Sequence, residues 1–141
     1  MTRGPRNTVT NVERVREMLS LADEMRVDEL IEYFDEDAVM ELPFAPGRME
    51  KRYAGKEAIL GFQRNACDSF STFSMAVDAI HETRDPRVVV AEHHSDGVVR
   101  ANGRAYRNRY VTFFTFDDAG RVRCWREYYD AGAVVRAFRP S

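Results

Sequence analysis

The sequence predicts an α+β domain in which N-terminal helices precede a long antiparallel sheet. Three observations carry this prediction. Apolar residues recur at helical spacing in the first half, the second half contains four segments rich in Val, Tyr, Phe and Thr, and turn signals separate these segments. Helices followed by an antiparallel meander are typical of α+β folds. At 141 residues the chain, 1–141, is expected to form one domain, with loose ends at 1–8 and 139–141.

The first half contains three expected helices. The first begins after Asn11, whose side chain is suited to cap it, and its apolar face consists of Val12, Val15, Leu19 and Ala22. A second short helix is predicted over 27–34. Residues 38–44 follow as a strand, which ends at the turn signal of residues 45–47. The third helix is expected to start after Gly55.

The second half is predicted to form strands over 72–82, 87–100, 104–117 and 121–130. Asn102-Gly103 indicates a hairpin, because a type I′ turn needs positive φ at both positions. Residues 117–120 (Asp-Asp-Ala-Gly) indicate a second hairpin turn. A last short helix is expected over 133–138.

The two turns predict which residues share a face of the sheet, because a hairpin's turn fixes its register. A two-residue loop at 102–103 places His93 opposite Thr112, and a four-residue loop at 117–120 places Thr112 opposite Trp125. Since side chains alternate with period two, one face then carries His93, Ser95, Asn108, Tyr110, Thr112, Trp125, Glu127 and Tyr129. A bulge at the second turn would put Arg126 in place of Glu127. We favour Glu127 inward, because this register sends the aromatic rings inward together.

Glu127 is the main catalytic candidate. A carboxyl among aromatic rings loses hydration, which raises its pKa toward neutrality and suits general acid or base chemistry. The alternative is a structural Glu paired with an Arg. His93 and Tyr110 are the further catalytic candidates, as a proton relay to Thr112 and as a hydrogen-bond donor, and both could instead be wall residues. The remaining inward residues are expected to bind substrate: Ser95, Asn108, Thr112, Trp125 and Tyr129.

Composition and charge exclude several function classes. The net charge is −2, so a basic nucleic-acid-binding face is not expected. No apolar run approaches the roughly 20 residues of a membrane span, and the polar first residues do not form a signal peptide. Cys67 and Cys124 are interpreted as free thiols in a reducing, cytoplasmic setting. No metal site is expected, because His93 and His94 point to opposite faces of one strand.

The order of several short segments resembles the SnoaL-like branch of the nuclear transport factor 2-like superfamily, which includes ketosteroid isomerases, polyketide cyclases and phenazine biosynthesis A/B proteins. The segments are 33–38, 41–44, 53–59, 106–110, 116–122 and 125–130. The resemblance implies a cone-shaped curved sheet wrapped by helices around an apolar cavity. It also implies a homodimer through the outer sheet face, to which Val111, Phe113 and Tyr128 are suited.

The resemblance also bears on the chemistry. The catalytic groups of ketosteroid isomerases would fall at Met18, Leu42 and Thr112, and all three are absent, so that activity is not expected. Polyketide cyclases and phenazine A/B proteins carry a carboxylate at the position of Glu127. The helix histidine and serine of the phenazine proteins fall on Phe62 and Ala66.

The sequence therefore favours a cofactor-free cyclase or isomerase of secondary metabolism, acting on a small apolar, carbonyl-bearing, polyketide-like molecule. Glu127 would move a proton, and Met18, Leu42 and Phe62 would join the aromatic residues in shaping the cavity. The alternative is a non-catalytic hydrophobic-ligand binding or self-resistance protein. An epoxide hydrolase ranks lower because only one carboxylate is well placed, and a purely structural dimerisation domain is a further possibility.

Overall fold

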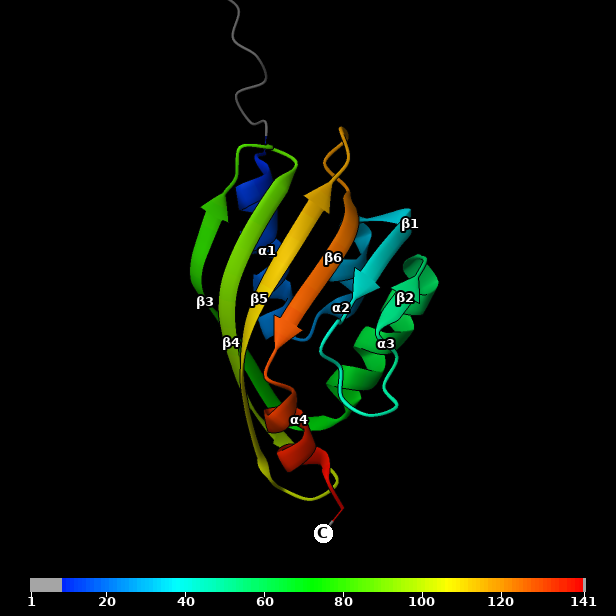
Figure 1. The fold of residues 1–141 in the computed structure, drawn as a ribbon, viewed down its shortest axis with the longest axis vertical. Helices are drawn as coiled ribbons and strands as arrows, with labels where there is room; N and C mark the ends of the chain where they lie inside the picture. Colours follow the sequence, from blue (N-terminus) through cyan, green and yellow to red (C-terminus); the bar gives the residue numbers. More distant parts are fainter. Residues whose placement is uncertain (1–8, 141) are drawn as a thin grey trace, which may run out of the picture.

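A curved six-stranded sheet with helices against one face forms the protein (Figure 1). The structure, a computed structural model, describes residues 9–140. The elements are α1 (Asn11–Asp23), α2 (Val27–Leu30), a 3-10 turn η1 (Ile31–Tyr33), β1 (Phe34–Glu41), β2 (Arg52–Ala54), α3 (Lys56–Asp68), β3 (Phe70–Glu82), β4 (Val88–Val99), β5 (Ala105–Phe116), β6 (Val122–Tyr129) and α4 (Ala131–Phe138). The α+β prediction is confirmed.

The sheet has the strand order β2-β1-β6-β5-β4-β3, so it is curved but not closed into a barrel. One pair departs from the antiparallel prediction, since β1 runs parallel to β6. No hairpin turn joins these two strands, so their relative direction is set by packing alone. β2, which the sequence did not predict, pairs with β1 at the edge.

Three predicted boundaries in the first half were wrong. The strand expected over 38–44 ends at Glu41. The N-cap of α1 is Thr10 rather than Asn11, because Thr10 and Glu13 form a reciprocal capping box. The second helix ends at Tyr33, and Phe34 opens β1 instead of closing the helix. Phe34 is fully buried, and its ring stacks on Trp125 with centroids 5.8 Å apart, so tertiary packing takes it into the strand.

Both hairpin registers differ from the predicted ones by two residues. His93 lies opposite Tyr110 rather than Thr112, and Thr112 lies opposite Glu127 rather than Trp125. Each inward residue nevertheless stays on the predicted face, because a shift of two preserves the alternation.

Tertiary contacts explain the first shift. The β4–β5 connection has four residues, closed by the bond from Val99 N to Arg104 O at 2.8 Å. The Asn102 side chain donates to Ala137 O of α4 at 2.9 Å, and Arg100 N donates to Ser69 O at 2.8 Å. These bonds hold the chain in a wider turn than Asn102-Gly103 forms alone.

At the second turn two one-residue changes add up. The loop is one residue shorter than predicted, since Asp117 N bonds Arg121 O at 2.8 Å. The ladder then shifts by one more residue between the Thr115–Cys124 and Phe116–Val122 pairs. The expected alternative, in which a bulge turns Arg126 inward, therefore does not occur.

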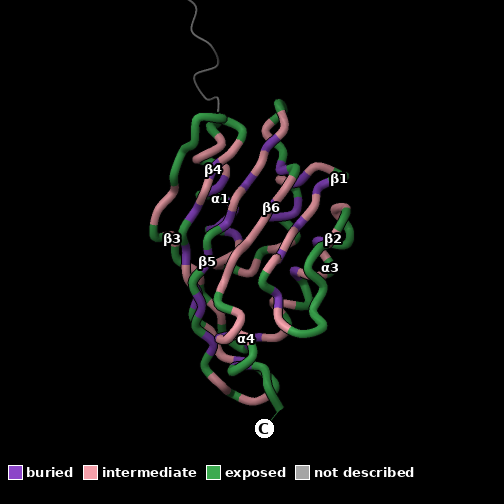
Figure 2. Tube along the Cα trace, viewed as in Figure 1, coloured by how far each residue is buried: buried purple, intermediate pink, exposed green. Residues whose placement is uncertain are grey.

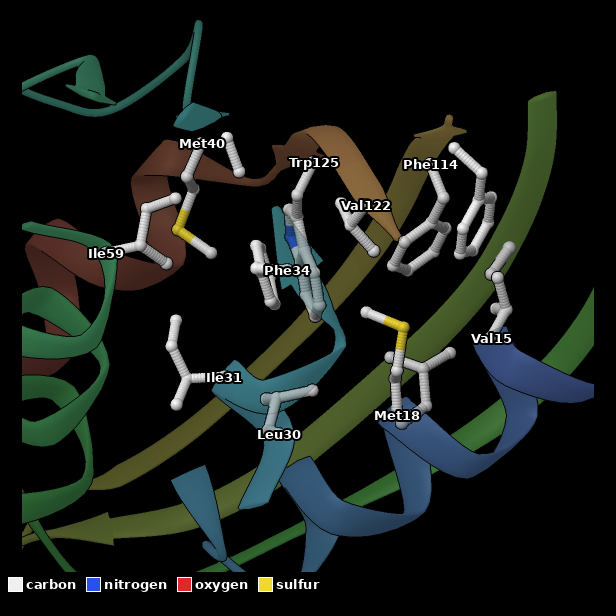
Figure 3. Close-up of a cluster of buried hydrophobic side chains, with 14 of the residues drawn as sticks. Val15, Met18, Leu30, Ile31, Phe34, Met40, Ile59, Phe114, Val122 and Trp125 are labelled. Atoms are coloured by element: carbon white, nitrogen blue, oxygen red, sulfur yellow. The ribbon is translucent and has the colours of Figure 1, made fainter. Parts of the chain in front are cut away.

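Along β5 buried residues on the inner face alternate with exposed or half-buried residues on the outer face, as the colours of the tube in Figure 2 indicate. The inner face of β5 is therefore buried along its whole length. The core lies between this face and α1, α2 and α3, and its side chains are drawn in Figure 3, where Met18 points from α1 into the cluster around Trp125 and Phe114. The outer face carries Val111, Phe113 and Tyr128, the predicted dimer residues, with Val111 exposed.

The two chain ends lie partly outside the residues that the structure describes. The expected loose segment 1–8 and Ser141 fall outside the described residues. Arg139, in the other expected loose end, follows α4, and its carbonyl accepts a bond from Arg104 at 2.8 Å. None of the helices within residues 9–140 is long and apolar enough to cross a membrane.

Candidate active site

A cavity of about 460 Å³ lies between α3, the inner face of β5 and β6, and α4. Its walls are mainly apolar. They include Phe62 and Ala66 from α3, Trp125 from β6 and Phe138 from α4. Among the described residues that line it, Glu127 is the only one with a carboxyl, amino or guanidinium group. Apolar walls with few polar groups are typical of small-molecule sites.

Glu127 is half-buried and faces this cavity from β6. Burial raises the pKa of its carboxyl to about 7, because the charged form loses hydration. Hydrogen bonds from Trp125 and Thr112 lower the pKa and only partly offset this effect. The Trp125 indole donates to Glu127 Oε1 at 3.2 Å. Near neutral pH the carboxyl can therefore both accept and donate a proton.

Thr112 and His93 form a second layer behind the carboxyl. Both are buried, and neither lines the cavity. His93 Nε2 lies 2.8 Å from Thr112 Oγ1, while its Nδ1 has no partner among the described residues. When the Thr112 hydroxyl donates to Glu127, its oxygen accepts from His93, so Nε2 carries the imidazole proton. Burial lowers the pKa of His93 to about 4 and keeps the ring neutral.

A chain of hydroxyls runs along β5 below this layer. The Tyr110 ring stacks on His93 with centroids 4.8 Å apart. Its hydroxyl lies 2.7 Å from Ser95 Oγ and 3.0 Å from the Tyr106 hydroxyl. Both tyrosines line the cavity, whereas Ser95 and Asn108 lie behind it. Burial raises the pKa of Tyr106, of Tyr110 and of Tyr129, so all three phenols stay protonated.

The predicted site residues therefore divide into three groups. Those that line the cavity are Glu127, Tyr110, Trp125, Tyr129 and Phe62. Those that lie behind its wall in hydrogen-bonded positions are His93, Ser95, Asn108 and Thr112. Met18 and Leu42 are fully buried in the core instead of lining the cavity.

Several residues that line the cavity were not predicted as site residues, and two of them carry polar groups that matter below, Tyr106 and Gln63. Tyr106 has the same parity as Tyr110 on β5, so the alternation itself could have found it. Gln63 on α3 is 7% exposed and lines the cavity, and its Oε1 has no partner among the described residues. No local pattern singles out a glutamine on a helix face, so this residue emerges only from the packing of α3.

The model of the SnoaL-like domain matches residues 15–125. This chain belongs to the SnoaL-like domain family. The matched range ends at Trp125, so the place of Glu127 rests on the structure. Similarity to a solved nuclear transport factor 2-like protein from Burkholderia pseudomallei, with a TM-score of 0.81 at 17% identity, supports the fold.

Individual relatives of this family member are also similar along most of its length. The chain is 30% identical to the uncharacterized protein YesE of Bacillus subtilis over 92% of this chain and 87% of that protein. A solved Bacillus subtilis structure described as a candidate isomerase is 31% identical, covers 92% of both chains and has a TM-score of 0.80. A candidate polyketide cyclase from Xanthomonas campestris is 20% identical, with a TM-score of 0.73 over 91% of this chain and 98% of that one.

Proposed function

We propose that this SnoaL-like protein is a cofactor-free cyclase or isomerase that moves a proton on a small, apolar, carbonyl-bearing molecule. The single observation that carries the proposal is the carboxyl of Glu127, alone among apolar walls and with its pKa raised to about 7. A general base works best when its pKa lies near the working pH. The similarity to a candidate isomerase and a candidate polyketide cyclase agrees with this reaction class.

The proposed reaction begins with the ionised Glu127 carboxylate, which removes a proton from the carbon next to the carbonyl and leaves an enolate. In a cyclase the enolate carbon attacks a second carbonyl of the same molecule. A carbon–carbon bond forms, and the new alkoxide takes the proton back from Glu127. In an isomerase Glu127 returns the proton to a different carbon. In both reactions the Glu127 carboxyl returns to the ionised form in which it began. A carboxyl that must take up a proton and then release it works best with a pKa near neutrality.

The test uses 2-tetralone, an apolar bicyclic ketone with acidic α-hydrogens, and follows exchange of these hydrogens for deuterium in D₂O by NMR. We expect the wild-type protein to accelerate exchange, and Glu127→Gln to lose this acceleration by roughly 10²–10⁴-fold, the usual contribution of an acid–base group. Glu92→Gln is the matched control, because Glu92 is exposed and pairs with His81 away from the cavity.

The outcomes separate two functions. Exchange at the wild-type rate in Glu127→Gln contradicts the proposal. Tight binding of 2-tetralone with no accelerated exchange in the wild-type protein instead supports the alternative of a binding or self-resistance protein. The apolar lining of the cavity is the observation that favours this second candidate, because such walls hold a ligand with or without turnover.

A further inference from the structure

Asn108 determines how the protons of the hydroxyl chain are arranged. Its Oδ1 accepts bonds from two backbone amides, Arg109 N at 2.8 Å and Asp130 N at 3.0 Å. Its Nδ2 donates to Asp130 O at 3.0 Å and to the Tyr106 hydroxyl at 2.8 Å. Because backbone N–H groups only donate and carbonyls only accept, the amide cannot be reversed. The Tyr106 oxygen is therefore an acceptor toward Asn108, and its own proton is free to go elsewhere.

The chain of three hydroxyls has one proton more than the number of hydrogen bonds between its members. Ser95, Tyr110 and Tyr106 carry one hydroxyl proton each, but only two contacts join them, Ser95–Tyr110 and Tyr110–Tyr106. Among the described residues no further acceptor contacts these hydroxyls. Ser95 is 2% exposed and does not line the cavity, whereas both tyrosines do. A spare proton on Ser95 would have no acceptor, so Ser95 donates to Tyr110, in agreement with the lowering effect of this bond on the pKa of Tyr110. The spare proton is then on a phenol that lines the cavity, where a ligand can accept it.

We propose that the Tyr106–Tyr110 pair is a carbonyl-binding site, which donates one hydrogen bond from its spare phenol proton to the oxygen of a ketone or of the enolate formed from it. The raised pKa of Tyr110 keeps the phenol protonated, so the donor is present across the neutral range. This inference deepens the proposed function, on which its catalytic meaning rests, by locating the carbonyl of the substrate.

The pair and Glu127 face the same cavity from neighbouring strands. Glu127 lies opposite Thr112 on the sheet, while the two phenol oxygens meet beside Asn108 on β5. A ketone whose oxygen accepts from the pair is therefore held in the cavity that Glu127 lines, and the carbon next to its carbonyl is the one from which Glu127 would take the proton.

Two probes of matched shape test the site, 4-phenylcyclohexanone and phenylcyclohexane, which differ by one carbonyl. Trp125 is the only tryptophan of the chain and lines the cavity, so quenching of its fluorescence measures binding. The infrared C=O stretch of the bound ketone, isotopically labelled at the carbonyl carbon, reports the hydrogen bond directly.

We expect the double variant Tyr106→Phe/Tyr110→Phe to lose ketone affinity relative to the hydrocarbon by about 2–12-fold, the value of one neutral hydrogen bond. Its bound C=O band should move to higher wavenumber. Tyr53→Phe is the matched control, because Tyr53 packs on Phe62 from outside the cavity lining. This control should keep the wild-type affinity ratio and band position.

An unchanged affinity ratio together with an unmoved band in the double variant overturns the proposal. If the double variant does not fold, the single variants decide, and a wild-type band in both of them overturns it equally. Glu127→Gln keeps the phenol pair, so it should retain the ketone preference while losing deuterium exchange. Failure of the carbonyl site and failure of the proposed proton transfer are thus observed in different measurements.

Discussion

Similar side chains have opposite surroundings on the two faces of the sheet formed by β4, β5 and β6. His93 and His94 are neighbours on β4, but His93 is buried without a charged partner while His94 contacts Asp78 at 2.9 Å at the surface. Glu127 faces the cavity alone, whereas Glu41 on the outer side lies 3.9 Å from Arg126. On the outer face several charged groups are paired and partly exposed to water. On the inner face loss of hydration shifts the pKa values, so that Glu127 keeps its proton up to about pH 7 and His93 stays neutral. A carboxyl that exchanges its proton near neutral pH is therefore found on the inner face.

The largest expected effect contrasts packing on the two faces. Phe114 is fully buried, and its ring meets Trp125 edge-on at 4.8 Å. Phe114→Ala should lower the free energy of unfolding by about 3–5 kcal/mol, because it leaves a cavity in the core. Val111→Ala, on the outer face, should change it by less than about 1 kcal/mol. Urea unfolding measures both, and similar losses in the two variants contradict the contrast.

The next largest expected effect is the pH dependence of the free energy of unfolding, to which Glu127 and His93 on the inner face contribute. The folded protein holds the Glu127 proton up to about pH 7, whereas the unfolded chain releases it near its ordinary 4.5, so this group makes stability fall as pH rises through that window. His93, with its pKa lowered to about 4 from 6.5, makes stability fall as pH decreases through 6.5. Each effect is about 3 kcal/mol at most, and they oppose one another between about pH 4.5 and 6.5.

Two variants separate these opposing slopes. Glu127→Gln should leave a profile in which stability rises from about pH 4 to 6.5, because only the histidine effect remains. His93→Gln should leave one in which stability falls from about pH 4.5 to 7. Urea unfolding at a series of pH values measures both, and Gln63→Leu, which removes no titratable group, is the control. Wild-type slopes in both variants would contradict the assignment of these groups.

Gln63 gives a smaller effect of opposite sign. Its Oε1 is buried without a partner among the described residues, which costs roughly 1–3 kcal/mol for a lost hydrogen bond. Gln63→Leu should therefore raise the midpoint of thermal unfolding, by an amount equivalent to about 1 kcal/mol, while removing a polar group from the cavity wall. Calorimetry measures the shift, with Asn65→Leu as the comparison, because Asn65 also lines the cavity from α3 but is exposed. A lower midpoint in Gln63→Leu would indicate that the amide is satisfied.

The smallest expected change in monomer stability belongs to Val111→Glu, because Val111 is 38% exposed. We propose that the outer face mediates a homodimer, as the family resemblance led us to expect. Light scattering should then give the wild-type protein twice the mass of one chain, and Val111→Glu the mass of a single chain. Val135→Glu is the charge-matched control, because Val135 is 52% exposed and lies on α4 rather than on the sheet. A monomeric wild-type protein excludes this assembly.

The sequence by itself determined the α+β class and the inward face of the sheet. Alternation is a local property with period two, so the inward position of Glu127, Tyr110 and Trp125 survived register errors of two residues at both hairpins. The same alternation places Tyr106 on the inward face, although Tyr106 was not among the predicted site residues.

Only the tertiary structure decided which inward residues reach the cavity. The placement of α3 and α4 leaves Tyr106 and Gln63 in its wall but buries Met18 and Leu42 in the core. Packing of Phe34 on Trp125 set the start of β1, and bonds from Asn102 and Arg100 widened the first hairpin. These contacts join residues far apart in the chain. The pKa of Glu127 likewise depends on the tertiary structure, because the groups that surround the carboxyl in space, and not its neighbours in sequence, remove its hydration.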